Sequence, residues 1–104
     1  MSDILLVQCT CPEADAERLA QALVGESLAA CVNQVGPVRS VYRWEGAIES
    51  GTEMLLLIKT TRACYPALQA RLQELHPYEV PEIIALPVSA GLPAYLQWLR
   101  ESVG

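Results

Sequence analysis

The sequence is poor in histidine, in basic residues and in glycine where a phosphate loop would need it. His76 is the only histidine, and seven Lys and Arg residues stand against twelve Asp and Glu, a formal net charge of −5. The basic residues are scattered, so a nucleic-acid partner is disfavoured on electrostatic grounds. The segment Cys-Thr-Cys-Pro-Glu (9–13), at the end of the first predicted strand, contains no glycine and therefore no phosphate-binding loop.

The chain also lacks the usual marks of enzymes and of membrane proteins. Only one histidine is available as a base, and no serine or cysteine lies in a context that indicates an activated nucleophile. The first apolar run, residues 4–7, is far too short for a signal peptide or a membrane span, and Asp3 precedes it rather than a cation. We therefore expect a soluble, cytoplasmic, non-enzymatic protein with no membrane partner and no required cofactor.

Apolar residues, in contrast, make up 52% of the 104 residues, enough for one packed domain over residues 1–104. Hydrophobic periodicity predicts three helices. The first follows an apparent capping box at Thr10 and Glu13, the second has helical spacing from Tyr65 to Leu75, and the third begins near Pro93. Strands are predicted at 3–10, 29–44, 47–61 and 80–88. The order strand, helix, strand, strand, helix, strand, with one helix appended, predicts an α+β, ferredoxin-like βαββαβ sandwich.

The two long predicted strands have features of a bent hairpin. Glu45-Gly46 is typical of the turn between them, and Gly36-Pro37 predicts a bulge or bend in the first. The runs 54–58 and 83–86 are apolar at every position, so we expect both faces of these strands to be covered. In a ferredoxin-like fold the helices cover only one face of the sheet, so an apolar second face implies that another chain covers it. Because most oligomers have closed symmetry, we expect a ring of identical chains.

The four cysteines admit two interpretations. Without an export signal they are expected to be free thiols. Cys9 and Cys11 are two residues apart, so on a strand they share a face, and such a pair can chelate a soft ion such as Cu(I) or Zn(II). The alternative, which we favour, is that Cys9, Cys31 and Cys64 act as small apolar core residues.

Several motifs together resemble the CutA divalent-cation tolerance family over essentially the whole chain. They are Leu-Ala-Ala-Cys-Val-Asn (28–33), Val-Tyr-Arg-Trp-Glu-Gly (41–46), Leu-Leu-Leu-Ile-Lys-Thr (55–60), His-Pro-Tyr-Glu-Val-Pro-Glu (76–82) and Tyr-Leu-Gln-Trp (95–98). The resemblance implies a homotrimer like that of the PII signalling proteins, and a link to copper and other divalent metals. It also implies a metal site at Cys9 and His76, although Leu75 stands where the family pattern has a further histidine.

Three functions follow as alternatives. The leading one is weak, non-catalytic binding of divalent ions such as Cu(II) by the Cys9–His76 pair. The second is a PII-like signalling trimer with an effector site in the cleft between subunits. The expected residues of that cleft are Tyr42, Trp44, Lys59, Tyr78, Glu79 and Glu82, beside His76. The third is a structural trimer that docks a protein partner. In it His76 and Tyr78 are hydrogen-bonded groups at a subunit boundary, and Lys59 either extends outward into water or pairs with Glu79 or Glu82.

Overall fold

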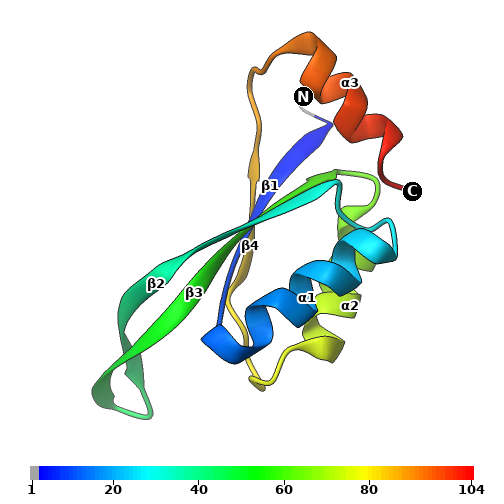
Figure 1. Cartoon of the computed structure of the whole chain (residues 1–104). Helices are drawn as coiled ribbons and strands as arrows, with labels where there is room; N and C mark the ends of the chain where they lie inside the picture. Colours follow the sequence, from blue (N-terminus) through cyan, green and yellow to red (C-terminus); the bar gives the residue numbers. More distant parts are fainter. Residues whose placement is uncertain (1–2) are drawn as a thin grey trace.

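The computed structural model describes residues 3–104, which form one antiparallel sheet with three helices (Figure 1). The elements in chain order are β1 (Ile4–Cys11), α1 (Glu13–Gly25), β2 (Cys31–Trp44), β3 (Ala47–Thr61), α2 (Tyr65–Leu75), β4 (Ile83–Pro87) and α3 (Pro93–Glu101). The strand order is β2-β3-β1-β4, and each neighbouring pair is antiparallel. This confirms the α+β, ferredoxin-like βαββαβ fold with an added C-terminal helix.

One face of the sheet is the core of the domain. Alternate residues of β1 and β3, among them Val7, Cys9, Leu56 and Ile58, are fully buried there. They pack against the apolar stripes of α1 and α2, which include Leu19, Leu23, Leu68 and Leu72. Both helices lie on this side of the sheet (Figure 1). Their predicted helical spacing is therefore confirmed, together with the end of α2 immediately before His76.

The opposite face, here called the helix-free face, is open over most of its length. α3 covers only one end of it, where Leu99 packs against Ile4. A single chain therefore leaves this face of the strands open, and its covering by a partner surface stays a prediction. Ile84 and Leu86 are 50% and 44% exposed. β4 is also shorter than predicted, because residues 80–82 form a linker that makes no ladder with β1.

β2 and β3 continue past the rest of the sheet as a two-stranded arm (Figure 1). The β1–β3 ladder ends at the pair Cys11–Met54, whereas β2 and β3 stay paired as far as Trp44 and Ala47. The turn residues Glu45 and Gly46 both have positive φ, 50° and 81°, as a tight hairpin turn requires. The predicted bulge is confirmed, since the β2–β3 register shifts between residues 35 and 38, and the Gly36–Pro37 peptide is cis.

The start of α1 differs from the prediction. Thr10 lies inside β1, paired with Leu55, and Pro12 is the N-cap residue, with no side-chain cap. The capping-box pattern was overridden because strand pairing holds residues 10 and 11 in the sheet.

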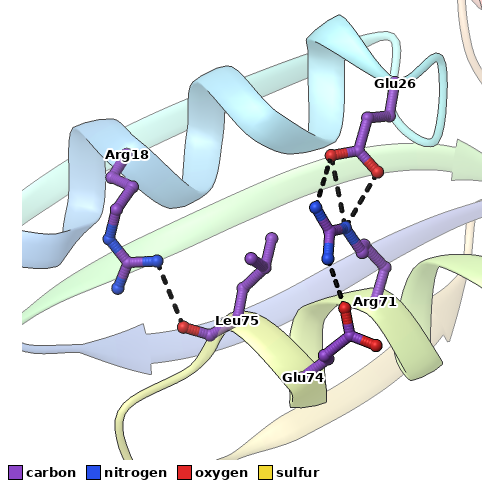
Figure 2. A network of polar contacts seen from close by, with 5 residues as sticks. All are labelled: Arg18, Glu26, Arg71, Glu74 and Leu75. Atoms are coloured by element: carbon purple, nitrogen blue, oxygen red, sulfur yellow. Dashed lines mark hydrogen bonds and ion pairs between the residues drawn. The ribbon is translucent and has the colours of Figure 1, made fainter.

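Polar contacts join α1 to α2 where the second helix ends (Figure 2). Arg18 donates to the carbonyl oxygen of Leu75 at 3.2 Å. Arg71 pairs with Glu26 of the α1 C-cap at 2.9 Å, and with Glu74 on its own helix. Each exposed pair contributes little alone, but together they fix the last turn of α2 and hence the starting point of the segment that carries His76. Within residues 3–104, no helix is long and apolar enough to span a membrane.

Candidate functional site

His76 fixes the linker between α2 and β4 to the end of β1. Its side chain is buried, only 7% exposed. Nδ1 accepts a hydrogen bond from the backbone N–H of Tyr78 at 3.1 Å, so Nε2 carries the ring proton and donates to the carbonyl oxygen of Thr10 at 2.8 Å. The imidazole also lies 4.8 Å from the Tyr78 ring. Both ring nitrogens are therefore engaged within the chain.

Cys9 lies close to His76, since both contact the same backbone oxygen. The Sγ atom of Cys9 is 3.6 Å from the Thr10 carbonyl oxygen, and the residue is fully buried. Burial, with negative charge at Cys11, Glu82 and Glu53 added, raises the pKa of the Cys9 thiol to about 12. The thiolate that a metal would need is thus strongly disfavoured.

The structure therefore brings Cys9 and His76, the predicted metal ligands, close together. However, both ring nitrogens of His76 already form hydrogen bonds, and the Cys9 thiol is buried in the core. Among residues 3–104, no group of three or more His, Cys, Asp and Glu side chains is arranged to hold a metal ion. The core interpretation fits Cys9, and Cys11 is buried in the same way. Cys31 and Cys64 are only half-buried, and all four thiols are free.

A groove of about 550 Å³ opens where the linker, the end of β1 and the β2–β3 arm meet. It brings together five of the six predicted cleft residues, Tyr42, Trp44, Tyr78, Glu79 and Glu82, and adds Thr10, Ser40, Val41, Glu53 and Val80. Tyr42, Trp44 and Tyr78 are 49%, 50% and 39% exposed, so their rings remain accessible.

Glu53 is the groove residue that the sequence analysis missed. Only 9% of it is exposed, and it accepts a hydrogen bond from the Tyr78 hydroxyl at 2.9 Å. Burial and this carboxylate raise the pKa of Tyr78 to about 12, so the phenol stays neutral and remains a donor. Its position directly before the apolar run 54–58 was the available signal, because a carboxylate there must share the burial of the strand.

The groove is acidic. Glu53, Glu79 and Glu82 line it, and among residues 3–104 no lysine or arginine does. Glu82 accepts a hydrogen bond from Gln8 at 3.2 Å, which ties the far end of the linker to β1. His76 and Glu82 thus hold the linker at both ends, so the groove wall that carries Tyr78 and Glu79 is positioned by the sheet.

Lys59 lies outside this groove in its own chain. It is six residues from Glu53 along β3, which corresponds to roughly 20 Å. Its ammonium group donates to the Asn33 side-chain oxygen at 2.5 Å and lies 5.9 Å from the centre of the Tyr95 ring. Within its own chain Lys59 thus contacts an amide and an aromatic ring, and its pairing with a carboxylate at a subunit boundary stays a prediction. Its place in a cleft between subunits would require a neighbouring chain and stays a prediction.

Comparison with known proteins gives a consistent family. Residues 5–102 match the family model described as CutA1 divalent ion tolerance protein. The divalent-cation tolerance protein CutA of Thermus thermophilus is 49% identical over 105 residues and covers all of both chains. Human protein CutA is 48% identical over 93 residues, and the match spans 88% of this chain but only 52% of the human protein. The Arabidopsis relative, 44% identical over 94% of this chain and 54% of its own length, is named chloroplastic.

Solved structures agree with this result. CutA from Xylella fastidiosa is 47% identical, with a TM-score of 0.96 over 99% of this chain and 100% of the other. An Archaeoglobus fulgidus structure described as periplasmic divalent cation tolerance protein CutA is 35% identical, with a TM-score of 0.93 over 97% and 99% of the two chains. The chain belongs to the CutA1 divalent-ion tolerance family.

Proposed function

We propose that this chain acts as a homotrimer that binds divalent cations such as Cu(II) weakly and without catalysis, in a metal-tolerance role. The family name supports the tolerance role. The observation that carries the binding proposal is the acidic groove, whose lining among residues 3–104 contains three glutamates and no lysine or arginine. Carboxylate oxygens in a hollow of one sign attract and retain cations.

Glu79 and Glu82 are the residues that we assign to the cation. Both are exposed at the groove, whereas Glu53 is buried and bonded to Tyr78. Two exposed carboxylates hold an ion only weakly, which fits a response to excess metal rather than a permanent metal centre. Cys9 and His76 remain a second possible ligand pair, since they converge on the Thr10 carbonyl. A metal there would have to displace the proton and the hydrogen bond of His76 Nε2.

The homotrimer is proposed from the surface that a single chain leaves open. The helix-free face exposes Ile84 and Leu86, and the outer edges of β2 and β4 have no strand partner among the described residues. The two ends of that face differ in charge, with the acidic groove at one and Lys59 at the other. Head-to-tail contact of unlike ends forms a ring when the rotation between neighbouring chains closes after three copies, and it would place Lys59 in the groove region of the next chain.

Native mass spectrometry during Cu(II) and Zn(II) titration tests both parts. The wild type should have the mass of a trimer and take up whole-number equivalents. A Glu79→Gln/Glu82→Gln variant should lose them, whereas Glu101→Gln, which removes a carboxylate from α3, should not. Loss of uptake in Cys9→Ser and His76→Ala with retention in the glutamate variant would instead assign the ion to the thiol–imidazole pair. Diffuse binding, equal in every variant, would contradict the proposal.

A small-molecule effector is the second candidate, and the half-exposed aromatic rings of the groove favour it. An apolar wall with a few convergent polar groups is the usual composition of a ligand site. A cytoplasmic location is also proposed, although relatives named chloroplastic and periplasmic have other locations.

A further inference from the structure

Lys59, the only lysine of the chain, has no carboxylate partner among residues 3–104. In β3 it alternates with Ile58 and Thr60, which are both fully buried in the core, so its side chain projects onto the helix-free face. Its ammonium group donates to the side-chain oxygen of Asn33 and lies over the Tyr95 ring. Within one chain the ammonium is thus held by neutral groups.

The proposed trimer makes this arrangement unfavourable. It covers the helix-free face, and an ammonium group that is removed from water without a counter-charge is strongly destabilised. The groove at the other end of the face offers that counter-charge, because Glu79 and Glu82 line it and neither has an ion-pair partner among the described residues. Head-to-tail contact therefore favours a pairing of Lys59 with the groove of the next chain.

This pairing and the proposed metal ion use the same oxygen atoms. Glu79 and Glu82 are the residues assigned to the metal, so the ion and the ammonium group compete for them. A divalent ion has the higher charge, whereas the ammonium group is tethered and therefore present at a high local concentration. Three glutamates face one lysine, so the groove still attracts a cation when Lys59 enters it. Such competition lowers the apparent metal affinity.

From these observations we infer that Lys59 is a two-position switch that links metal binding to subunit contact. In the metal-free trimer its ammonium group pairs with Glu79 and Glu82 of the next chain. A divalent ion at those carboxylates releases the ammonium group, which returns to Asn33 and Tyr95, its position in the single chain. By linkage, the metal ion weakens the subunit contact by the same factor as the contact weakens metal binding. The inference rests on the proposed function, since it requires both the trimer and the metal at the two glutamates.

Calorimetric titration of the full chain with Zn(II), after its mass in solution has been measured, tests the inference. Lys59→Met keeps an unbranched side chain and removes the charge, so Zn(II) should bind several-fold to about tenfold more tightly than to the wild type. Asn33→Ala removes the acceptor of the released ammonium group and should weaken Zn(II) binding. Arg62→Met is the matched control, because it removes one positive charge from the turn after β3 and should bind Zn(II) like the wild type.

The single lysine also allows the switch to be observed directly by NMR. Protein labelled with ¹³C only at lysine reports the Cε group of Lys59 alone. Zn(II) should shift its protons upfield, because the released ammonium group lies over the face of the Tyr95 ring. Tyr95→Leu should remove most of that shift. If Lys59→Met does not assemble, this signal of the wild type decides the question.

The outcomes separate the switch from the proposed function. A trimer that binds Zn(II) through Glu79 and Glu82 with equal affinity in Lys59→Met and the wild type, or with an unmoved Lys59 signal, would overturn the inference and leave the proposed function standing. A monomer, or Zn(II) uptake that does not depend on the two glutamates, refutes both.

Discussion

Replacing Ile84 with aspartate separates the stability of the single chain from that of its assembly. Ile84 lies on edge strand β4, on the helix-free face, and is 50% exposed. In one chain the new carboxylate would remain in water and cost little. In a trimer that buries this face, the lost apolar contact costs about 1 kcal/mol per chain. A buried, unpaired carboxylate costs several kcal/mol more.

Over three chains, these penalties reach on the order of 10 kcal/mol, enough to raise the dissociation constant by several orders of magnitude. We expect Ile84→Asp to be a folded monomer, with wild-type far-ultraviolet circular dichroism and one third of the wild-type mass by light scattering. Val24→Asp is the matched control, because Val24 is 44% exposed on α1, away from the helix-free face. A wild-type trimer with unchanged melting temperature in Ile84→Asp would refute the partner-surface argument.

Three further predictions concern the site and the ends of the fold. His76→Ala removes two hydrogen bonds and the ring contact, so the free energy of unfolding in urea should fall by about 2 kcal/mol, and a change below about 0.5 kcal/mol would contradict the bridging role. Because the pKa of the Cys9 thiol is raised to about 12, alkylation at about pH 8 should label Cys9 only after unfolding, and stability should fall as pH rises from about 9 toward 12, since the unfolded thiol ionises first. Labelling of Cys9 in the native state would disprove its burial. Arg100 lowers the pKa of Asp3, so this pair stabilises the fold above the ordinary carboxyl pKa and the effect is lost as pH falls through the lowered value. Arg100→Gln should move the NMR titration midpoint of Asp3 upward, and an unmoved midpoint would contradict the pairing.

The sequence predicted elements best where periodicity and turn chemistry agree. The hairpin strand 47–61 has the predicted bounds, because Glu45-Gly46 favours the tight turn and the β-branched Thr60 and Thr61 extend the strand beyond the apolar run 54–58. The start of α1 was mispredicted, because a capping box reflects only the residues next to the helix. The pairing of Thr10 with Leu55 in the β1–β3 ladder joins distant segments and cannot be inferred from the residues around Thr10. The short β4 has the same cause: Val80 favours a strand locally, but residues 80–82 have no ladder partner, and Pro81 has no backbone N–H to donate to one.

The groove was predictable in part. Five of its residues were named because aromatic and acidic side chains gather in the segments 41–46 and 76–82. Lys59 was predicted to join them in a cleft between subunits, so its distance from Glu53 along β3 of one chain leaves that prediction untested. Glu53 was missed because its place directly before the apolar run 54–58 is only a weak sign of burial, and its hydrogen-bond donor, the Tyr78 hydroxyl, comes from a segment 25 residues further along the chain.

The metal pair shows why ligand chemistry in a sequence is weaker evidence than the hydrogen bonds of the folded chain. Cys9 and His76 are the residue types that copper prefers, and they do meet in space. Yet the imidazole uses both nitrogens to hold the linker, and the thiol is buried with its proton. The two hydrogen bonds of the His76 ring hold the linker against β1, and this position lets the Tyr78 hydroxyl reach Glu53 and form one wall of the groove. A cation that binds at the groove carboxylates would therefore depend on His76 without touching it, so loss of binding in His76→Ala alone cannot identify a ligand. Only the glutamate variant, measured beside it, distinguishes a ligand from a residue that positions the wall.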